Sequence, residues 1–260
     1  MNLRDKMDAV RPPAGRLAIH YLGQAGFVVK RSNGRTIMID PYFSELAKRL
    51  FGFKRMSPPP TGWERFVPDD FLATHAHVDH LDTDSLPIFV KNPGTFFVGA
   101  PDCREPFKAA GLTPDRFAIL REGETWLKDG ISIRGIAADH GELAPDALGL
   151  LIETDGLSIY DAGDTALIPD RIAASLATEI DVLIAPINGA FGNLTASDAV
   201  ALAERLRPKT VIASHFWMFL EHVAPGGVGD PTTFLTEAKK RLTPLGIQSV
   251  VLAPGETFLV

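Results

Sequence analysis

Short apolar runs separated by polar turns make up most of this 260-residue chain. The first two runs, residues 17–30 and 35–40, are separated by Ser32-Asn33-Gly34, a strong turn signal, and predict a β-hairpin. A second hairpin is predicted further along, around the turn at Asp155-Gly156.

Strand and helix patterns then alternate. The other apolar runs that predict strands are residues 71–75, 95–100, 117–120, 125–128, 131–138, 148–154, 157–163, 181–187, 209–215, 248–253 and 256–260. The patterns that predict helices are residues 41–56, 82–90, 101–111, 168–180, 198–207 and 231–242. Thr195 and Asp198 resemble a capping box before one of these helices. Hairpins followed by strand–helix units predict an α/β fold with mixed rather than purely parallel sheets.

The chain reads as one domain. Residues 1–16 are expected to be an N-terminal lead-in, and residues 17–260 a single domain without repeats or a dividing linker. Residues 57–60 read Ser-Pro-Pro-Pro, which excludes helix and central strand. That stretch, with the segment before it, predicts a surface excursion that could serve as a lid.

The composition of the chain disfavours some partners and some cellular locations. The formal net charge of −6 argues against nucleic acid or an anionic membrane as a partner, although a metal site would still allow an anionic substrate. The chain has one cysteine and no apolar run long enough for a signal peptide or a membrane span. We therefore expect a cytoplasmic protein, with a homo-oligomer left open.

Four polar side chains follow predicted strands directly. His75, His140, Asp164 and His215 each lie at or just after the C-terminal end of a strand. Functional sites of layered α/β folds are built at that edge. A single histidine at a strand end is more often structural, but four such positions together predict a site.

Residues 75–80, His-Ala-His-Val-Asp-His, are the densest cluster. In extended chain, residues i and i+2 point the same way, so His75 and His77 can face one point. If the chain then bends, Asp79 and His80 can face a neighbouring point.

Two adjacent groups of nitrogen and oxygen ligands predict a site for two divalent metal ions. The first group is His75, His77, His140 and Asp164, and the second is Asp79, His80, Asp164 and His215, with Asp164 as the bridge. These ligands suit zinc or manganese, with iron as an alternative. Each group leaves room for solvent, as catalytic sites do.

Other polar residues have weaker patterns. Asp161 is expected near the metal ligands or in a turn, and Asp40 as a brace for the cluster or a cap. His20 and His222 are expected to be structural, and Cys103 a small buried residue.

The aromatic residues after His215 have two interpretations. Phe216, Trp217 and Phe219 could line a pocket or belong to the core.

The ordered ligand set resembles that of the metallo-β-lactamase superfamily. The set is His75, His77, Asp79, His80, His140, Asp164 and His215. The resemblance covers residues 17–260 and implies an αβ/βα sandwich: two mixed β-sheets flanked by helices, with the metal site at one edge.

Within that superfamily the chain is similar to the L-ascorbate-6-phosphate lactonase group. The matching stretches are residues 21–27, 39–43, 74–82, 163–165, 186–195 and 214–219. This implies manganese or zinc and a phosphorylated sugar lactone. Two positions depart from the group: Ala190 stands where arginine is common, and Trp217 where polar residues are common. Without that arginine, a bidentate phosphate partner is lost.

The sequence therefore predicts a metal-dependent hydrolase that uses a metal-bound hydroxide on a small-molecule ester, favouring a lactone. Asp79 would orient the hydroxide and exchange its proton, and Asn188 would stabilise the oxyanion. The alternatives are a phosphodiesterase for RNA or a phospholipid headgroup, and a non-catalytic metal-binding protein. A redox di-iron role is disfavoured, because flavodiiron relatives usually have glutamate where this chain has His77.

Overall fold

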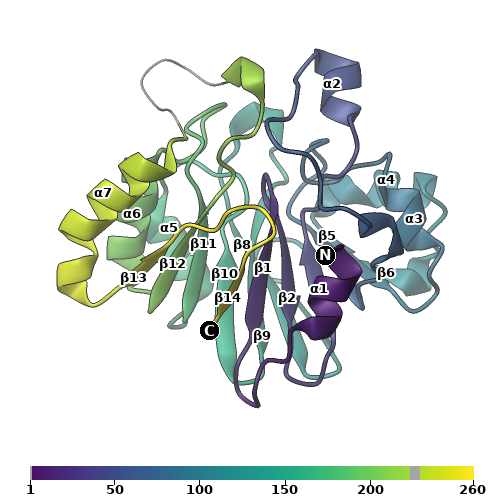
Figure 1. The fold of residues 1–260 in the computed structure, drawn as a ribbon, viewed down its shortest axis with the longest axis horizontal. Helices are drawn as coiled ribbons and strands as arrows, with labels where there is room; N and C mark the ends of the chain where they lie inside the picture. Colours follow the sequence, from purple (N-terminus) through teal and green to yellow (C-terminus); the bar gives the residue numbers. More distant parts are fainter. Residues whose placement is uncertain (1, 223–228) are drawn as a thin grey trace.

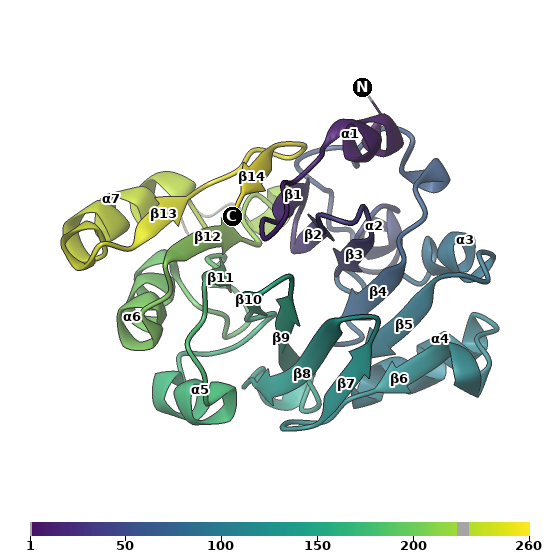
Figure 2. The ribbon, with the colours of Figure 1, turned by 90° about the horizontal axis from the view of Figure 1, so that it is seen from below.

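Two β-sheets packed face to face form the centre of the molecule, and helices cover their outer sides (Figures 1 and 2). The computed structural model describes residues 2–222 and 229–260; the side chain of His222, which the sequence predicts to be structural, lies outside the described part. The predicted α/β architecture of two mixed sheets flanked by helices is confirmed.

The first sheet has the strand order β14-β1-β2-β3-β4-β5-β6 in the part of the chain that the structure describes. Its strands are β1 (Ala18–Gly23), β2 (Gly26–Lys30), β3 (Thr36–Ile39), β4 (Asp70–Ala73), β5 (Phe96–Gly99), β6 (Phe117–Ile119) and β14 (Thr257–Leu259). Pairing is antiparallel from β14 to β3 and parallel from β3 to β6. Strands β3 and β4 therefore end at the same edge.

The second sheet has the order β13-β12-β11-β10-β9-β8-β7. Its strands are β7 (Thr125–Lys128), β8 (Ile131–Ala137), β9 (Leu148–Thr154), β10 (Leu157–Asp161), β11 (Val182–Pro186), β12 (Thr210–Ser214) and β13 (Gln248–Val250). Strand β9 is antiparallel to both β8 and β10, while β10, β11 and β12 are parallel. The C-terminal ends of β8, β10, β11 and β12 consequently share one edge of this sheet.

Helices lie on both outer sides. The α-helices are α1 (Leu3–Ala9), α2 (Leu46–Phe51), α3 (Leu86–Val90), α4 (Arg104–Ala109), α5 (Pro169–Leu176), α6 (Ala196–Leu206) and α7 (Pro231–Arg241). Short 3-10 helices are η1 (Trp63–Arg65), η2 (Pro101–Cys103), η3 (Pro114–Arg116), η4 (Gly141–Leu143), η5 (Leu220–His222) and η6 (Thr243–Leu245). Helices α5, α6 and α7 flank the second sheet, and α3 and α4 the first (Figure 2). In the described ranges, none of the helices has the length and hydropathy of a membrane span.

A continuous apolar core fills the space between the sheets. Phe27 and Phe71 of the first sheet and Leu150 and Ile184 of the second are fully buried in one cluster. Burial of this kind, rather than local propensity, holds the strand ends in fixed positions.

The first predicted hairpin has one more reversal than the sequence pattern indicates. Residues 17–30, expected as one arm, form β1 and β2, which pair antiparallel with Gly23 opposite Gly26. Gly23 and Gln24 take positive φ angles of 99° and 58°, which turn the chain within the run.

The helix expected over residues 41–56 is much shorter, since α2 covers only Leu46–Phe51. The carboxylate of Asp82 accepts hydrogen bonds from the backbone N–H groups of Phe43 and Ser44, at 2.9 and 2.7 Å, which holds the preceding residues out of the helix. Gly52, in the left-handed conformation, ends it.

The N-terminal residues contain a helix that their polar composition did not indicate. Helix α1 buries Leu3 and Met7 in the main core. The capping box of α6 is confirmed, with Thr195 and Asp198 bonded reciprocally.

Candidate metal centre

The strand ends bring the predicted polar residues together. His75 follows β4 of the first sheet, whereas His140, Asp164 and His215 follow β8, β10 and β12 of the second. Because those three strands run in the same direction, their C-terminal ends meet at one edge, opposite the end of β4. A site between the two sheets results.

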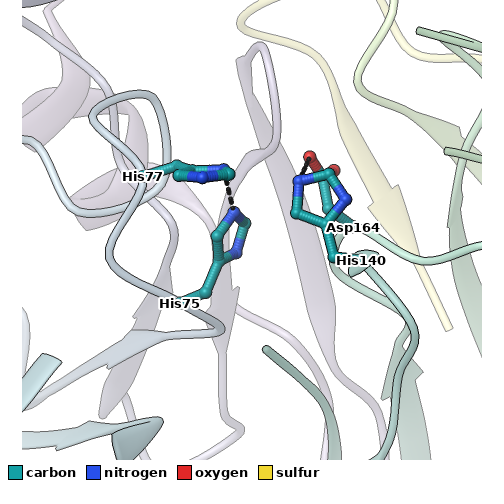
Figure 3. A group of neighbouring side chains, drawn as sticks. All are labelled: His75, His77, His140 and Asp164. Atoms are coloured by element: carbon teal, nitrogen blue, oxygen red, sulfur yellow. Dashed lines mark hydrogen bonds and ion pairs between the residues drawn. The ribbon is translucent and has the colours of Figure 1, made fainter. Parts of the chain in front are cut away.

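The first group of side chains spans both sheets. One ligand atom from each of His75, His77, His140 and Asp164 lies within 4.8 Å of the others. His75 Nε2 is 2.9 Å from His77 Nδ1, and His140 Nε2 is 3.6 Å from Asp164 Oδ2. Figure 3 shows His75 and His77 on one side, facing His140 and Asp164 on the other.

The second group adjoins the first. Asp79, His80 and His215 also have ligand atoms within 4.8 Å of one another, and His80 Nε2 is 3.0 Å from His215 Nε2. The chain bends as a second ligand point requires, because the N–H of His80 donates to the carbonyl of His77 at 2.9 Å. That turn directs Asp79 and His80 to a point beside the one that His77 faces.

Asp164 lies between the two groups. Its Oδ2 is 3.6 Å from His140 Nε2 and 3.5 Å from His80 Nε2, while Oδ1 is 3.2 Å from His215 Nε2. Burial alone would raise the pKa of this carboxyl, but His215 and His80 outweigh it and hold the pKa well below its usual range. Asp164 is therefore an ionised carboxylate in the position of a bridge.

A hydrogen-bond chain behind the imidazoles fixes which nitrogen carries the proton. Asp40 accepts from the Thr74 hydroxyl at 2.6 Å, and its Oδ2 is 2.7 Å from His80 Nδ1. The Thr74 oxygen, having donated its proton, can accept from His75 Nδ1 at 3.1 Å. His75 and His80 then each hold a proton on Nδ1 and direct Nε2 at the site, and the neutral His75 presents that nitrogen bare.

His77 carries its proton on Nε2 rather than on Nδ1. Its Nε2 lies 3.1 Å from the carbonyl of Leu143, so Nε2 donates and Nδ1 is bare. The lone pairs of His75 Nε2 and His77 Nδ1 thus face each other across 2.9 Å. Two facing lone pairs repel unless a cation lies beside them, so this donor set fits a metal ion.

The electrostatic surroundings agree with a cation site. Burial is the main cause that lowers the pKa of His75 well below its usual value, which keeps this imidazole neutral. Burial also disfavours the charged form of His80, but Asp164 and Asp40 overcome it and raise its pKa well above the usual value. Two carboxylates thus favour positive charge at the second group, and an ion bound there would displace the proton from His80 Nε2.

A cavity of about 400 Å³ opens over both groups. His77, Asp79, His140, Asp164 and Asn188 are its polar lining residues. A cavity of this size is typical of a small-molecule site.

Asn188, predicted as an oxyanion donor, follows β11 and is only 5% exposed. Its Nδ2 lies 3.1 Å from Met218 Sδ, and its Oδ1 has no hydrogen-bond partner among the described residues. A weak sulfur acceptor uses one amide hydrogen and leaves the second available.

Apolar side chains form the rest of the cavity wall. The segment around α2, predicted as a lid, contributes Ala47, Phe51 and Phe53. Of the three aromatics after His215, Phe219 lines the cavity and Phe216 is buried in the core. Trp217 is 52% exposed and does not line it.

The weaker sequence predictions have clear outcomes. Asp40 braces the cluster, and Asp161 forms a turn by accepting from the N–H of Gly163 at 3.0 Å. His20 bonds Thr257 at 2.8 Å and belongs to neither ligand group, and Cys103 is buried.

Two functional contacts were not predicted from the sequence. They are Thr74, which links Asp40 to both imidazoles, and the carbonyl of Leu143. The position of Thr74 directly before His75 was an available signal, whereas a backbone carbonyl leaves none.

Comparison with known proteins identifies the family. The family model described as "Beta-lactamase superfamily domain" matches residues 18–215. A UPF0173 metal-dependent hydrolase of Polynucleobacter asymbioticus is 29% identical over 223 residues, covering 78% of this chain and 75% of that protein.

Solved structures show the same fold. Igni18, a metallo hydrolase from Ignicoccus hospitalis, has a TM-score of 0.68 at 24% identity and covers 94% of this chain and 98% of that one. An isothiocyanate hydrolase from Delia radicum gut bacteria has a TM-score of 0.73 at 20% identity, covering 93% and 98%. The predicted superfamily is confirmed: the chain belongs to the metallo-β-lactamase superfamily, and the curated protein compared with it is described as a metal-dependent hydrolase.

Proposed function

We propose that this protein is a metal-dependent hydrolase of a small carboxylic ester, with a lactone as the favoured substrate. The observation that carries the proposal is the pair of adjoining ligand groups on either side of Asp164, open to a cavity of small-molecule size. The description of its curated relatives as metal-dependent hydrolases supports hydrolysis as the reaction type.

The residues that would hold two divalent ions are those of the two groups. The first ion would be held by His75, His77, His140 and Asp164, and the second by Asp79, His80, Asp164 and His215. Bare imidazole nitrogens with carboxylate oxygens suit zinc or manganese, with iron as an alternative. When bound, such ions polarise a carbonyl and lower the pKa of water to near neutrality.

The chain's own side chains would handle the attack and the developing charge. Asp79 lines the cavity, with its Oδ2 3.7 Å from His215 Nε2, and would orient the attacking water and take its proton. The second amide hydrogen of Asn188 would donate to the carbonyl oxygen as it becomes negative. The asparagine sits at the end of a buried strand, so this donor is preorganised.

The reaction type can be tested with substrates that differ in the bond broken. The metal content of the purified protein is measured first. Turnover is then measured at fixed metal content with a lactone (δ-valerolactone), an ester (p-nitrophenyl acetate) and a phosphodiester (bis(p-nitrophenyl) phosphate). We expect the lactone and the ester to be hydrolysed at least tenfold faster than the phosphodiester. Faster phosphodiester hydrolysis would reassign the site to phosphorus chemistry.

The role of the ligands is tested by His77→Ala, which removes one bare nitrogen from the first group. We expect loss of bound metal and of turnover together. Lys48→Ala, at an exposed position on α2, is the matched control and should retain both. A His77→Ala protein that lost metal but hydrolysed at the wild-type rate would overturn the proposal.

A further inference from the structure

The walls of the cavity are much less polar than its base. Above the ligand groups, the cavity is lined by Phe51, Phe53, Leu143, Phe191, Met218 and Phe219, besides smaller apolar residues. Two of these rings remain open to solvent, since Phe51 is 59% and Phe191 is 55% exposed. Large exposed aromatic side chains at a cavity are surfaces on which an apolar ligand can be buried.

Phe191 is held in its position by a constrained loop. It takes a positive φ of 52°, a conformation that bulky residues rarely adopt. The turn around it closes with the N–H of Asn193 donating to the carbonyl of Ala190 at 3.0 Å. The N–H of Leu194 then donates to the carbonyl of Thr165, the residue after Asp164, at 3.0 Å. These bonds hold the backbone of the loop that carries Phe191 beside the segment that carries Asp164.

The part of the cavity wall that includes Phe51 is held in place by contacts between aromatic rings. The rings of Phe51 and Phe53 have centroids 5.8 Å apart, and Phe53 lies 5.6 Å from Phe219. Phe219 in turn packs against the buried Tyr42 at 6.1 Å. This row of aromatic rings connects the exposed Phe51 to the protein interior.

The described part of the cavity lining has no lysine or arginine side chain that could pair with a phosphate. Arg55, on the nearby segment, donates to the carbonyls of Tyr42, Ser44 and Ser57. Arg49 is paired with Asp84 on the surface.

We propose that the site takes an uncharged lactone or ester with an apolar ring or alkyl chain, which Phe51 and Phe191 contact, and that it discriminates against phosphorylated sugar lactones. This inference rests on the proposed ester hydrolysis and names its substrate class. The carbonyl would face the ligand groups at the cavity base, and the apolar part would lie along the aromatic walls. Phe51 and Phe191 are specificity-determining residues in this arrangement.

The test compares lactones of one ring size with the metal-loaded protein. The substrates are δ-valerolactone, δ-decalactone and 6-phosphogluconolactone. Each buried methylene is worth about fourfold in binding, so even partial burial of the alkyl chain should raise kcat/KM for δ-decalactone at least tenfold over δ-valerolactone. The phosphorylated lactone should be the poorest of the three.

Variants of the wall residues test their role in substrate choice, which is measured as kcat/KM for δ-decalactone divided by kcat/KM for δ-valerolactone. Phe51→Ala and Phe191→Ala should each lower the δ-decalactone to δ-valerolactone ratio about tenfold. Leu127→Ala, which removes a 72% exposed side chain on β7 outside the cavity, should leave the ratio unchanged. A wild-type ratio near one, or preferred turnover of 6-phosphogluconolactone, would overturn the inference.

A binding measurement separates this inference from the proposed reaction. If neither the lactones nor p-nitrophenyl acetate is hydrolysed, the proposed function fails, and calorimetry with 5-hydroxypentanoate and 5-hydroxydecanoate tests the cavity alone. Tighter binding of the longer acid, lost in Phe191→Ala, would support the apolar cavity. Equal affinity for both acids would exclude it.

Discussion

The carboxylate of Asp40 lies 2.7 Å from Nδ1 of His80, and this contact sets the chemical state of the imidazole. Asp40 follows β3 and His80 follows the turn after β4, so two neighbouring parallel strands supply the pair. The contact leaves His80 Nε2 facing His215 Nε2 at 3.0 Å. Asp40 itself has a positive φ of 43°, a strained conformation that its bonds to Thr74 and His80 help to hold.

Replacing Asp40 with asparagine should weaken metal binding without removing a ligand. The amide lacks the charge that holds the proton on His80 Nδ1, so His80 Nε2 becomes a poorer and less fixed donor. We expect metal affinity to fall about 10- to 100-fold. Competition with a chelator of known affinity measures this change.

Asp115→Asn is the control, because it makes the same chemical change at an exposed carboxylate in η3. It should retain the wild-type affinity. An Asp40→Asn protein with unchanged metal affinity would mean that Asp40 only stabilises the fold.

Gly163 should not tolerate a side chain. A Cβ there would lie 3.0 Å from both Thr74 Cβ and Cγ2, and the residue has a φ of 56°. Gly163→Ala should therefore displace Thr74, which bonds Asp40 and His75, and lower both stability and metal affinity. We expect a loss of at least ~2 kcal/mol of unfolding free energy, measured by denaturant titration.

Gly156→Ala separates the steric effect from the backbone effect. Gly156 has a φ of 78° but nothing within 4 Å of its added Cβ. It should lose about 1 kcal/mol of stability and no metal affinity. If both variants behaved alike, the close approach of Gly163 to Thr74 would not matter to the site.

The members of the two candidate ligand groups could be picked out from the sequence because their chemistry is visible in the residue type. His75, His140, Asp164 and His215 are polar residues placed directly after apolar runs, and the directions of their strands bring them together. Spacing also indicated that Asp79 and His80 could face a second point if the chain bent after His77, and the structure has that bend. Such patterns require no knowledge of tertiary contacts.

Contacts made by the backbone and by irregular segments were not predictable in this way. The β1–β2 turn was missed, yet its Gln24 carbonyl accepts from the N–H of His215 at 2.9 Å. The cavity residues Phe51 and Phe191 lie at a helix end and in a loop, where apolar residues follow no period. Tertiary hydrogen bonds to Asp82 likewise overrode the helical pattern of residues 41–45.

Asp70 should make the stability of the protein depend on pH. Burial is the main cause that raises the pKa of this carboxyl from 3.8 to about 6, although Arg35 opposes it. The folded state therefore binds the proton more tightly than the unfolded state, so the contribution to stability is complete below pH 4 and is lost as the pH rises through 6.

Asp70→Asn removes this dependence. The unfolding free energy of the variant minus that of the wild type should rise by about 1 kcal/mol between pH 5 and pH 8. Denaturant unfolding at matched metal concentrations measures this difference. Effects of pH on the metal ligands are common to both proteins and cancel in the difference. A difference that stayed constant over this range would show that Asp70 keeps an ordinary pKa.

Removal of bound metal should destabilise the folded protein. Without a cation, the lone pairs of His75 Nε2 and His77 Nδ1 face each other at 2.9 Å, and the buried Asp164 carboxylate keeps its charge. At a metal concentration 100 times Kd, binding adds about 2.7 kcal/mol to the unfolding free energy. For a chain of this length that corresponds to a Tm shift of about 5–10 °C.

Calorimetry of the protein with zinc or manganese, and again after dialysis against a chelator, measures this shift. His75→Ala removes a ligand from the first group, so its Tm should respond much less to added metal than the wild-type Tm does. Equal Tm values for the wild type with and without metal would mean that the two groups are not coupled to folding through an ion. A full metal response in His75→Ala would instead place the stabilising ion in the second group, with Asp79, His80 and His215.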